Sequence, residues 1–342
     1  MVPALAVAGA LRSNGAHVEF IGGERAEATL VPQAGYTLHT ISVEGLSRSN
    51  PLRALRALGK AAAALLRARR LLKQIAPDAV MGGGGYVAGP VGVAAVSLRI
   101  PLVLTEADSH LGLTNRLLAP FARRVCLAFA LPGRDGARYR VTGRPIPPHT
   151  AARAAAREYF GLGEGETCVL VFGGSLGARS INLAAIDGLA DAPYRVLHVS
   201  GRRDYPELSA RELRAGYDLR EYLDLEEFGL ALQASDLVVA RSGGSVFEIA
   251  AHGRPAVLIP YPHSAADHQS ANARWMVDAG AAVLIVDGEL DAARLRGEVD
   301  GLLGDPDRLA RMTEASAGLA RPRAAEEVAQ ELLLACDAMA AA

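Results

Sequence analysis

Two glycine-rich turns in the second half of the chain have the composition of phosphate-binding turns. Each follows an apolar run of strand length and precedes a segment of helical period. Backbone N–H groups and the dipole at a helix N-terminus stabilise anions, and glycine lets a phosphate approach closely. A plain tight turn is the alternative for either one alone, but two together favour a nucleoside diphosphate. The turns contain Gly173, Gly174 and Ser175, and Gly243, Gly244 and Ser245.

One carboxylate, Glu248, follows the second turn and lies in the first turn of the expected helix. The helix dipole favours an acid at that position. Ser245 and Glu248 are three residues apart, which is the spacing of a capping box. The functional interpretation is that Glu248 accepts hydrogen bonds from two vicinal ribose hydroxyls, as acids near nucleotide-binding turns do.

A polar cluster, expected in a loop before a helix, contains His263, Asp267, His268, Gln269 and Asn272. It lacks the HxxxH and HxxEH spacings of metal sites, and amides are poor metal ligands. Amide and imidazole groups are better suited to sugar hydroxyls. We therefore expect a sugar contact here and no metal.

The first half of the chain also has polar loops after apolar runs. A glycine turn spans 82–85, and a second loop contains Glu106, Asp108, His110, Thr114 and Asn115. At the carboxyl ends of parallel strands, these loops would face the turns of the second half. By residue type His110 and Asp108 are candidate general bases, although a lone loop histidine is more often a simple polar contact.

Residues 51–75 are predicted to form a basic helix, since the stretch 50–73 contains no acid. One interpretation is a solvated face opposite a core face. The other is a helix that binds anionic lipid headgroups. On a helix, Arg53, Arg56, Lys60 and Arg67 share one arc, and Leu55, Leu58, Leu65 and Leu66 lie away from it.

Apolar runs alternate with helical segments throughout, which is the pattern of βα units around parallel sheets. The uncharged stretch 79–98 is interpreted as a strand, a glycine turn and a helix, and not as a membrane span, because glycines and Pro90 divide it. The expected strands are 17–22, 38–43, 78–82, 102–106 and 124–129, then 168–173, 194–201, 236–241, 256–261 and 281–286.

Length and composition agree with this α/β class. The chain has 342 residues, enough for two domains, with 50% hydrophobic residues and only 5% aromatic ones. A formal net charge of −1 gives no global attraction to nucleic acid, so we expect no nucleic-acid partner. Three scattered cysteines argue against a disulfide framework and fit a reducing cytoplasm.

The expected domains are 1–147, 148–320 and a C-terminal helix, 321–342, that packs back across them. Prolines at 145, 147 and 148 predict an irregular linker over 141–157. The first half opens with a helix and lacks an initial strand and glycine turn. A doubly wound sheet normally places that strand in its middle, so we expect either that the sequence begins too late or that the domain is damaged.

Taken in order, these motifs resemble the MurG family of peripheral membrane N-acetylglucosaminyltransferases. The resemblance runs nearly end to end. Its carriers are "PALAVAGAL", "GGGGYVAGP", "GLTNRLLAPFARRV", "VTGRPIP", "FGGSLGARSIN", "SGGSVFEIAAHGRPAVLIPYP" and "DHQSANARWMVDAGAA".

The resemblance implies a GT-B fold, with two Rossmann-like doubly wound domains and a cleft between them. It implies inverting transfer of GlcNAc from UDP-GlcNAc to the C4 hydroxyl of MurNAc-pentapeptide in lipid I. The product is lipid II for peptidoglycan synthesis, and neither a metal nor another cofactor takes part. The expected location is the cytoplasmic face of the bacterial cell membrane, reached through the basic helix 51–75.

The resemblance also implies residue roles. Ser175 and its turn would lie near the diphosphate, Gly243 to Ser245 would support the nucleotide, and Glu248 would hold the ribose. His268 and Gln269 would contact the GlcNAc hydroxyls, with Asn272 supporting them. The expected acceptor-binding residues are Gly84, Gly85, Tyr86, Glu106, Asp108, Thr114 and Asn115.

Several features depart from the family pattern. The family's N-terminal glycine-rich loop and its histidine are associated with acceptor binding and base catalysis, and both would directly precede Met1. Asp108 stands where many members carry an amide, Pro147 stands where an arginine is common, and the turn before Glu248 is one residue shorter. Two alternatives therefore remain: an enzyme like the UDP-GlcNAc 2-epimerases, or a non-catalytic UDP-sugar-binding subunit of a cell-wall complex.

Overall fold

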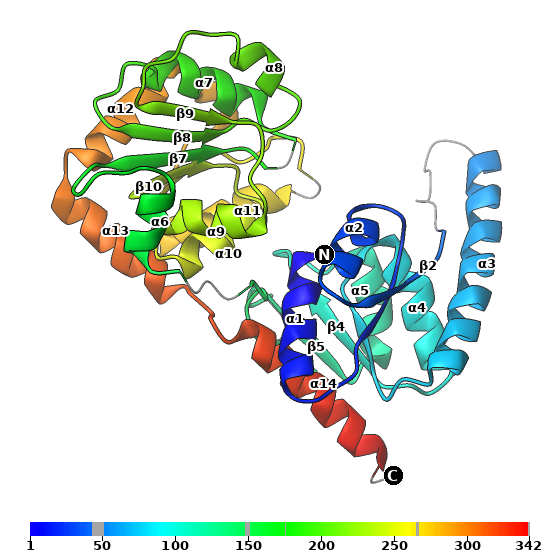
Figure 1. The fold of residues 1–342 in the computed structure, drawn as a ribbon. Helices are drawn as coiled ribbons and strands as arrows, with labels where there is room; N and C mark the ends of the chain where they lie inside the picture. Colours follow the sequence, from blue (N-terminus) through cyan, green and yellow to red (C-terminus); the bar gives the residue numbers. More distant parts are fainter. Residues whose placement is uncertain (43–50, 148–150, 175, 265–266, 341–342) are drawn as a thin grey trace. The chain divides into compact units, whose positions relative to one another are not determined.

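The computed structural model describes residues 1–42, 51–147, 151–174, 176–264 and 267–340, with side chains from residue 62 in the helix that begins at Pro51 and up to residue 337 in the last helix. The chain divides into two units (Figure 1). One comprises residues 1–148 and 321–342, and the other comprises 149–320. Each unit contains parallel strands and helices, which confirms the expected α/β class.

The second unit has one six-stranded parallel sheet, in the order β12-β11-β10-β7-β8-β9. Because β7 lies beside both β8 and β10, the order of the strands reverses between β7 and β10. Doubly wound sheets bind ligands at the carboxyl ends of the strands beside such a reversal. The strands are β7 (Cys168–Phe172), β8 (Arg195–Val199), β9 (Tyr217–Arg220), β10 (Leu237–Ala240), β11 (Ala256–Leu258) and β12 (Ala282–Leu284).

Helices cover both faces of this sheet (Figure 1). Val169 and Val171 pack into one core with residues of α7 (Arg179–Leu189) and α12 (Ala292–Leu303). Strand alternation turns Phe172 to the other face, where its ring lies 4.9 Å from that of Phe228 in α9. The remaining helices are α6 (Arg153–Tyr159), α8 (Tyr205–Leu208), α9 (Leu225–Ala234), α10 (Ser245–Ala251), α11 (His268–Asp278), η3 (Asp287–Glu289) and α13 (Pro306–Gly318).

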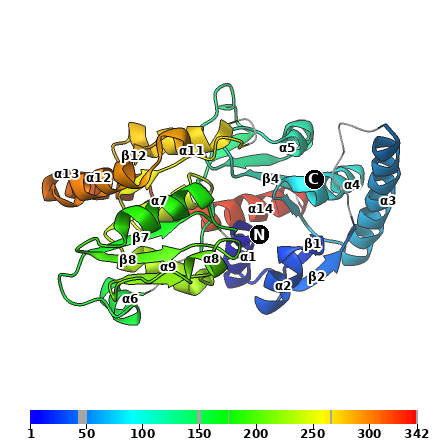
Figure 2. The same cartoon turned by 90° about the horizontal axis from the view of Figure 1, so that it is seen from above.

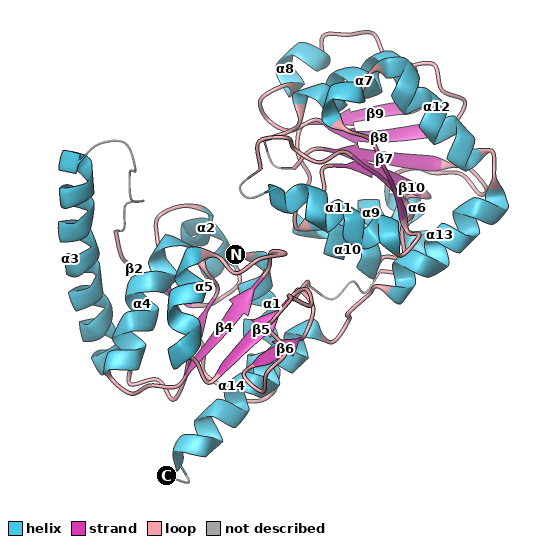
Figure 3. Cartoon of the chain, turned by 180° about the vertical axis from the view of Figure 1, so that it is seen from behind, coloured by secondary structure: helices cyan, strands magenta, loops and turns pink. Residues whose placement is uncertain are grey.

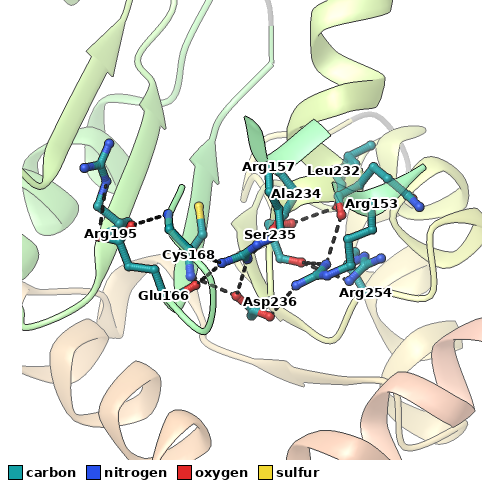
Figure 4. Close-up of polar contacts among 12 residues, drawn as sticks. Arg153, Arg157, Glu166, Cys168, Arg195, Leu232, Ala234, Ser235, Asp236 and Arg254 are labelled. Carbon is teal, nitrogen blue, oxygen red and sulfur yellow. Dashed lines mark hydrogen bonds and ion pairs between the residues drawn. The ribbon is translucent and has the colours of Figure 1, made fainter. Parts of the chain in front are cut away.

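Arginine side chains make hydrogen bonds and ion pairs with residues at the amino-terminal edge of this sheet (Figure 4). Arg153 donates to Asp236 at 2.5 Å and to the carbonyl of Ser235 at 2.8 Å. Asp236 also accepts the backbone N–H of Cys168, and Arg254 donates to the Ser235 carbonyl. Burial lowers the pKa of Arg254 to about 10. These contacts therefore join α6 to the starts of β7 and β10, at the edge opposite the glycine turns.

The first unit contains two groups of parallel strands. β1 pairs with β2, and a separate sheet has the order β3-β4-β5-β6. Among the described residues, β1 and β3 each pair on one side only. The strands are β1 (Glu19–Gly22), β2 (Thr37–Thr40), β3 (Val80–Gly82), β4 (Leu102–Glu106), β5 (Arg124–Leu127) and β6 (Tyr139–Val141).

Alternation along β4 creates a core on each face of the four-stranded sheet. Leu102 and Leu104 pack with residues of α3, α4 and α5, whereas Val103 packs with residues of α1 and α14. Figure 3 shows α14 along β4, β5 and β6. The helices are α1 (Val2–Ser13), α2 (Ala26–Gln33), α3 (Pro51–Ile75), α4 (Gly85–Ser97), α5 (Leu113–Leu118), η1 (Ala119–Phe121) and α14 (Ala324–Ala340).

Glu331 fixes α14 to this sheet. Its side chain is 2% exposed, and its two oxygens each accept one guanidinium hydrogen bond at 2.6 Å, from Arg124 of β5 and Arg140 of β6. Charged hydrogen bonds of this kind are short and strong. They attach residues 321–342 to the first unit, where α14 also runs beside α1 (Figure 2).

Most expected elements occur where the sequence places them. Stretch 79–98 forms β3, a turn and α4, and among the described residues no helix is both long and apolar enough to cross a membrane. The strands β6 and β9 were not expected. The prediction of an irregular linker over 141–157 is wrong in its last part, because α6 begins at Arg153. A favourable run of alanines and arginines after the prolines explains this start.

The leucines of helix α3 differ from one another in burial. Leu65 packs against the core, but Leu66 is 58% exposed and lines a groove with Arg67 and Arg70. Leu66 lies four residues before Arg70, so the two share a face of the helix. Leu66 therefore does not belong to a core face, as the interpretation of a solvated face opposite a core face would require. The side chains of Arg53, Leu55, Arg56, Leu58 and Lys60 lie outside the described residues.

We expect Glu331→Gln to lower the free energy of unfolding by about 2 kcal/mol, because it leaves two guanidinium groups without their shared carboxylate. Urea unfolding followed by circular dichroism measures the change. Glu327→Gln is the matched control: Glu327 lies on the same helix, is 26% exposed and contacts Arg140 at 3.5 Å. The control should lose less than about 1 kcal/mol. Equal losses in the two variants would contradict this account.

Candidate functional site

The two glycine turns of the second unit leave neighbouring strands at the same edge of the sheet. β7 ends at Phe172, which pairs with Ala240 at the end of β10. The turns that follow therefore both emerge at the reversal of strand order, where doubly wound sheets bind ligands. Gly173 and Gly174 are described, whereas Ser175 lies outside the described residues.

The first turn is possible only with glycine at several positions. Gly174 and Gly177 have φ values of +99° and +81°, in the left-handed region that favours glycine. At Gly173, a side-chain Cβ would lie 2.3 Å from the backbone nitrogen of Ala178. The turn leads directly into α7, so its backbone N–H groups lie at a helix N-terminus. This is the arrangement that binds phosphate groups.

The second turn places Glu248 as the sequence predicts, in the first turn of α10. The alternative interpretation of Glu248, as the acid of a capping box with Ser245, does not hold. Gly244 is the N-cap residue, and as a glycine it has no side chain that could cap the helix. The hydroxyl of Ser245 donates to the carbonyl of Arg241 at 3.4 Å. Ser245 is already inside the helix and cannot occupy the N-cap position that a capping box requires.

The polar cluster beside this turn lies mainly on a helix. α11 begins at His268, so His268, Gln269 and Asn272 are helical and not in the expected loop. The side-chain oxygen of Gln269 accepts the N–H of Tyr261 at 3.0 Å. A Cβ on Gly243 would lie 4.0 Å from the Gln269 amide nitrogen, so this N–H₂ group lies over the turn.

Asn272 makes a buried hydrogen bond to the backbone at the start of the second turn. It is fully buried and donates to the carbonyl of Ser242 at 3.1 Å. Its side-chain oxygen has no hydrogen-bond partner among the described residues. Ser242 in turn donates to the backbone carbonyl of Gln269 at 2.7 Å. Helix α11 and the second turn are therefore locked together by two hydrogen bonds in opposite directions.

Arg241, directly before the second turn, connects it to the helix that follows the first turn, a role that the sequence does not reveal. Its guanidinium donates to Ser180, in the first turn of α7, at 2.8 Å and to Asp287 at 2.5 Å. Ser180 also donates to Asp287 at 2.7 Å. The signal in the sequence is the position of an arginine between a buried strand and a glycine pair. Its partners are 61 and 46 residues away, so only the fold shows them.

In the first unit, Glu106 organises the loop after β4. It is buried, and its carboxylate accepts the N–H groups of Asp108 at 3.2 Å and Gly112 at 2.8 Å. Asn115 donates to the same carboxylate at 2.9 Å and to the carbonyl of Thr105 at 2.9 Å. These contacts show a supporting role for Glu106 and Asn115 within the loop.

The loop after β3 lies beside this loop. Gly84 and Gly85 both have positive φ values, and Thr114 donates to the Gly85 carbonyl at 3.3 Å. Tyr86 is 65% exposed, and the two candidate bases, Asp108 and His110, are partly exposed. The structure thus brings the expected residues of the first unit to the carboxyl ends of β3 and β4. Among the described residues, no group of three potential ligands could hold a metal ion.

Sequence comparison assigns both halves of the chain to one family. Residues 1–127 match the glycosyltransferase family 28 N-terminal domain, and residues 168–328 match the family's C-terminal domain. Over 335 residues the chain is 43% identical to the UDP-N-acetylglucosamine--N-acetylmuramyl-(pentapeptide) pyrophosphoryl-undecaprenol N-acetylglucosamine transferase of Rubrobacter xylanophilus, covering 96% of this chain and 98% of that protein.

Solved structures with similar folds agree. The crystal structure of Acinetobacter baumannii MurG is 28% identical, with a TM-score of 0.75, and covers 97% of this chain and 95% of that one. The UDP-GlcNAc 2-epimerase from Neisseria meningitidis bound to UDP-GlcNAc is 13% identical, with a TM-score of 0.68 and coverage of 97% and 96%. At that identity the epimerase shares the fold alone. Because the two domain matches span most of the sequence and the Rubrobacter relative aligns over nearly all of it, the chain belongs to glycosyltransferase family 28.

Proposed function

We propose that this protein transfers GlcNAc from UDP-GlcNAc to the C4 hydroxyl of MurNAc-pentapeptide in lipid I and so makes lipid II for peptidoglycan synthesis. The main support for this proposal is that nearly the whole chain is 43% identical to a transferase named for this reaction. The two glycine turns at the reversal of strand order supply the type of site that a nucleotide sugar needs.

In this proposal the donor lies over the carboxyl ends of β7 and β10. The turn of Gly173, Gly174 and Ser175 receives the diphosphate at the N-terminus of α7. The turn of Gly243, Gly244 and Ser245 supports the nucleotide, and Glu248 accepts hydrogen bonds from the ribose hydroxyls. His268 and Gln269 contact the GlcNAc hydroxyls from the start of α11, and Asn272 holds that helix against the second turn.

The chemistry is an inverting displacement without a metal. A general base removes the proton of the acceptor C4 hydroxyl, and its oxygen attacks the anomeric carbon on the face opposite the diphosphate. The bond from that carbon to the diphosphate oxygen breaks, and UDP leaves with the negative charge. Backbone N–H groups and the dipole of α7 stabilise this charge as it develops.

The acceptor in this proposal binds at the loops after β3 and β4. Gly84, Gly85, Tyr86 and Thr114 border it, and Glu106 with Asn115 keeps the second loop in shape. His110 and Asp108 are the candidate bases, because both are partly exposed on the loop that Glu106 holds.

We further propose that the protein docks on the cytoplasmic face of the bacterial cell membrane through the basic helix α3. The described part of its outer face joins an exposed leucine, Leu66, to Arg67 and Arg70 around a groove of about 490 Å³. An apolar side chain flanked by guanidinium groups matches the boundary between acyl chains and anionic headgroups.

The two alternatives have less support. The epimerases resemble this chain at the level of the fold alone. A non-catalytic UDP-sugar-binding subunit would bind UDP-GlcNAc and transfer nothing. The deciding experiment measures transfer of radiolabelled GlcNAc from UDP-GlcNAc to a lipid I analogue. We expect labelled disaccharide lipid as product and no conversion of UDP-GlcNAc into UDP-ManNAc. UDP-GlcNAc binding without any transfer would instead support the non-catalytic alternative.

We expect Glu248→Gln to weaken UDP binding about tenfold, since a charged acceptor of ribose hydroxyls becomes a neutral amide. Calorimetric titration with UDP and with 2′-deoxy-UDP measures this. The wild type should prefer UDP, and the variant should lose most of that preference. Glu314→Gln, on the exposed surface of α13, should behave as the wild type. An unchanged preference in Glu248→Gln would rule out the ribose contact.

A second prediction concerns the base. Substitution of the residue that acts as the base, by His110→Ala or Asp108→Asn, should lower kcat about a hundredfold or more and leave the Kd for UDP unchanged. Ser109→Ala, between the two candidates, is the control for disturbance of the loop. If neither variant lowers kcat beyond about threefold, both candidates are wrong.

A further inference from the structure

A chain of neutral hydrogen bonds runs through the interior of the second unit and ends behind the first glycine turn. His198, on β8, is fully buried. Its Nδ1 lies 2.8 Å from the hydroxyl of Tyr217 on β9, and its Nε2 lies 3.0 Å from the side-chain oxygen of Asn182 on α7. The three side chains therefore connect the edge strand β9 and its neighbour β8 to the helix that follows the turn.

The donors and acceptors of Tyr217, His198 and Asn182 allow these hydrogen bonds to run in one direction only. The side-chain oxygen of Asn182 can only accept, so Nε2 of His198 carries the proton, and Nδ1 accepts the hydroxyl proton of Tyr217. Burial lowers the pKa of His198 to about 3, and burial raises the pKa of Tyr217. Both groups are therefore neutral near pH 7, and the direction of the hydrogen bonds is fixed there.

The chain continues from Asn182 into the loop after β8. The amide nitrogen of Asn182 donates to the carbonyl of Ser200 at 2.8 Å and to Asp204 at 2.8 Å. Asp204 is itself held by Arg203 at 2.8 Å. Because His198 holds the oxygen of this amide, the nitrogen is aimed at the loop. Without His198 the buried oxygen of Asn182 would lose its hydrogen-bond donor, and the side chain could shift away from the Ser200 carbonyl to find another.

The glycine turn rests directly on that loop. A Cβ on Gly177 would lie 2.0 Å from the carbonyl oxygen of Ser200, and a Cβ on Gly201 would lie 2.2 Å from the backbone nitrogen of Gly177. The two backbones therefore pack without any space for a side chain. A shift of the Ser200 carbonyl by a few tenths of an ångström would move Gly177 with it.

We propose that His198 is a positioning residue for the donor nucleotide: by orienting the amide of Asn182 it fixes the Ser200 carbonyl and, through it, the backbone of the glycine turn. This inference rests on the proposed function, since it takes the turn to be the diphosphate site. His198 touches no substrate in this account. Its effect is on donor affinity, with none on the acceptor.

The test compares three variants by calorimetric titration with UDP and by steady-state kinetics. His198→Leu removes both hydrogen bonds and should weaken UDP binding about tenfold, with the KM for the lipid I analogue unchanged. His198→Gln can still donate to Asn182 and accept from Tyr217, so it should restore affinity to within about threefold of wild type.

Tyr217→Phe is the matched control, because it removes a buried hydrogen bond to His198 on the side away from the loop. It should lower the Tm as His198→Leu does, but leave the Kd for UDP within about threefold of wild type. The ratio of the Kd values of His198→Leu and wild type should stay constant from about pH 6 to pH 9, because His198 does not titrate there.

Equal Kd values for His198→Leu and wild type, with only the Tm lowered, would overturn the inference and leave the proposed function intact. Equal losses of UDP affinity in His198→Leu and Tyr217→Phe would also overturn it, because they indicate general loosening of the core. If wild type binds no UDP, the proposed function itself fails. Should His198→Leu not fold, Asn182→Ser replaces it with the same expected loss of affinity.

Discussion

The parallel pairing of β7 with β10 is the constraint on which the candidate donor site depends. These two strands lie where the order of the sheet reverses, and their last residues, Phe172 and Ala240, are partners. Parallel strands in register end at the same edge, so both glycine turns emerge side by side. Turns 70 residues apart in the sequence can therefore contact one ligand.

Close packing behind these turns determines where their backbones lie. Gly177 rests on the Ser200 carbonyl with no space for a Cβ, and Arg241 connects the second turn to Ser180 and Asp287. Buried, hydrogen-bonded groups of this kind have few alternative arrangements, because an unpaired one is costly. The backbone N–H groups are thus positioned before any ligand arrives, which reduces the cost of ordering them on binding.

In the first unit too, buried hydrogen-bonded groups hold a loop in place, and here the central group is a carboxylate. Glu106, at the carboxyl end of β4, gathers backbone and amide N–H groups and so shapes the loop that carries both candidate bases. At the neighbouring strands, Arg124 and Arg140 hold Glu331 and fix the last helix to the sheet. One buried carboxylate thus shapes a loop, and the other attaches a distant segment of the chain.

The sequence by itself determined the α/β class, the strands with continuous apolar runs, both glycine turns and the position of Glu248 at a helix start, because each is a local pattern of burial or backbone conformation. It missed β6 and β9, whose "YRV" and "YDLR" are too short and polar to stand out. It left a capping box of Ser245 and Glu248 open as an alternative, which the structure excludes because the helix already begins at Ser245. The roles of Arg241 and His198, and the exposure of Leu66, were decided only by the tertiary structure, because their partners come from distant segments that the sheet brings together.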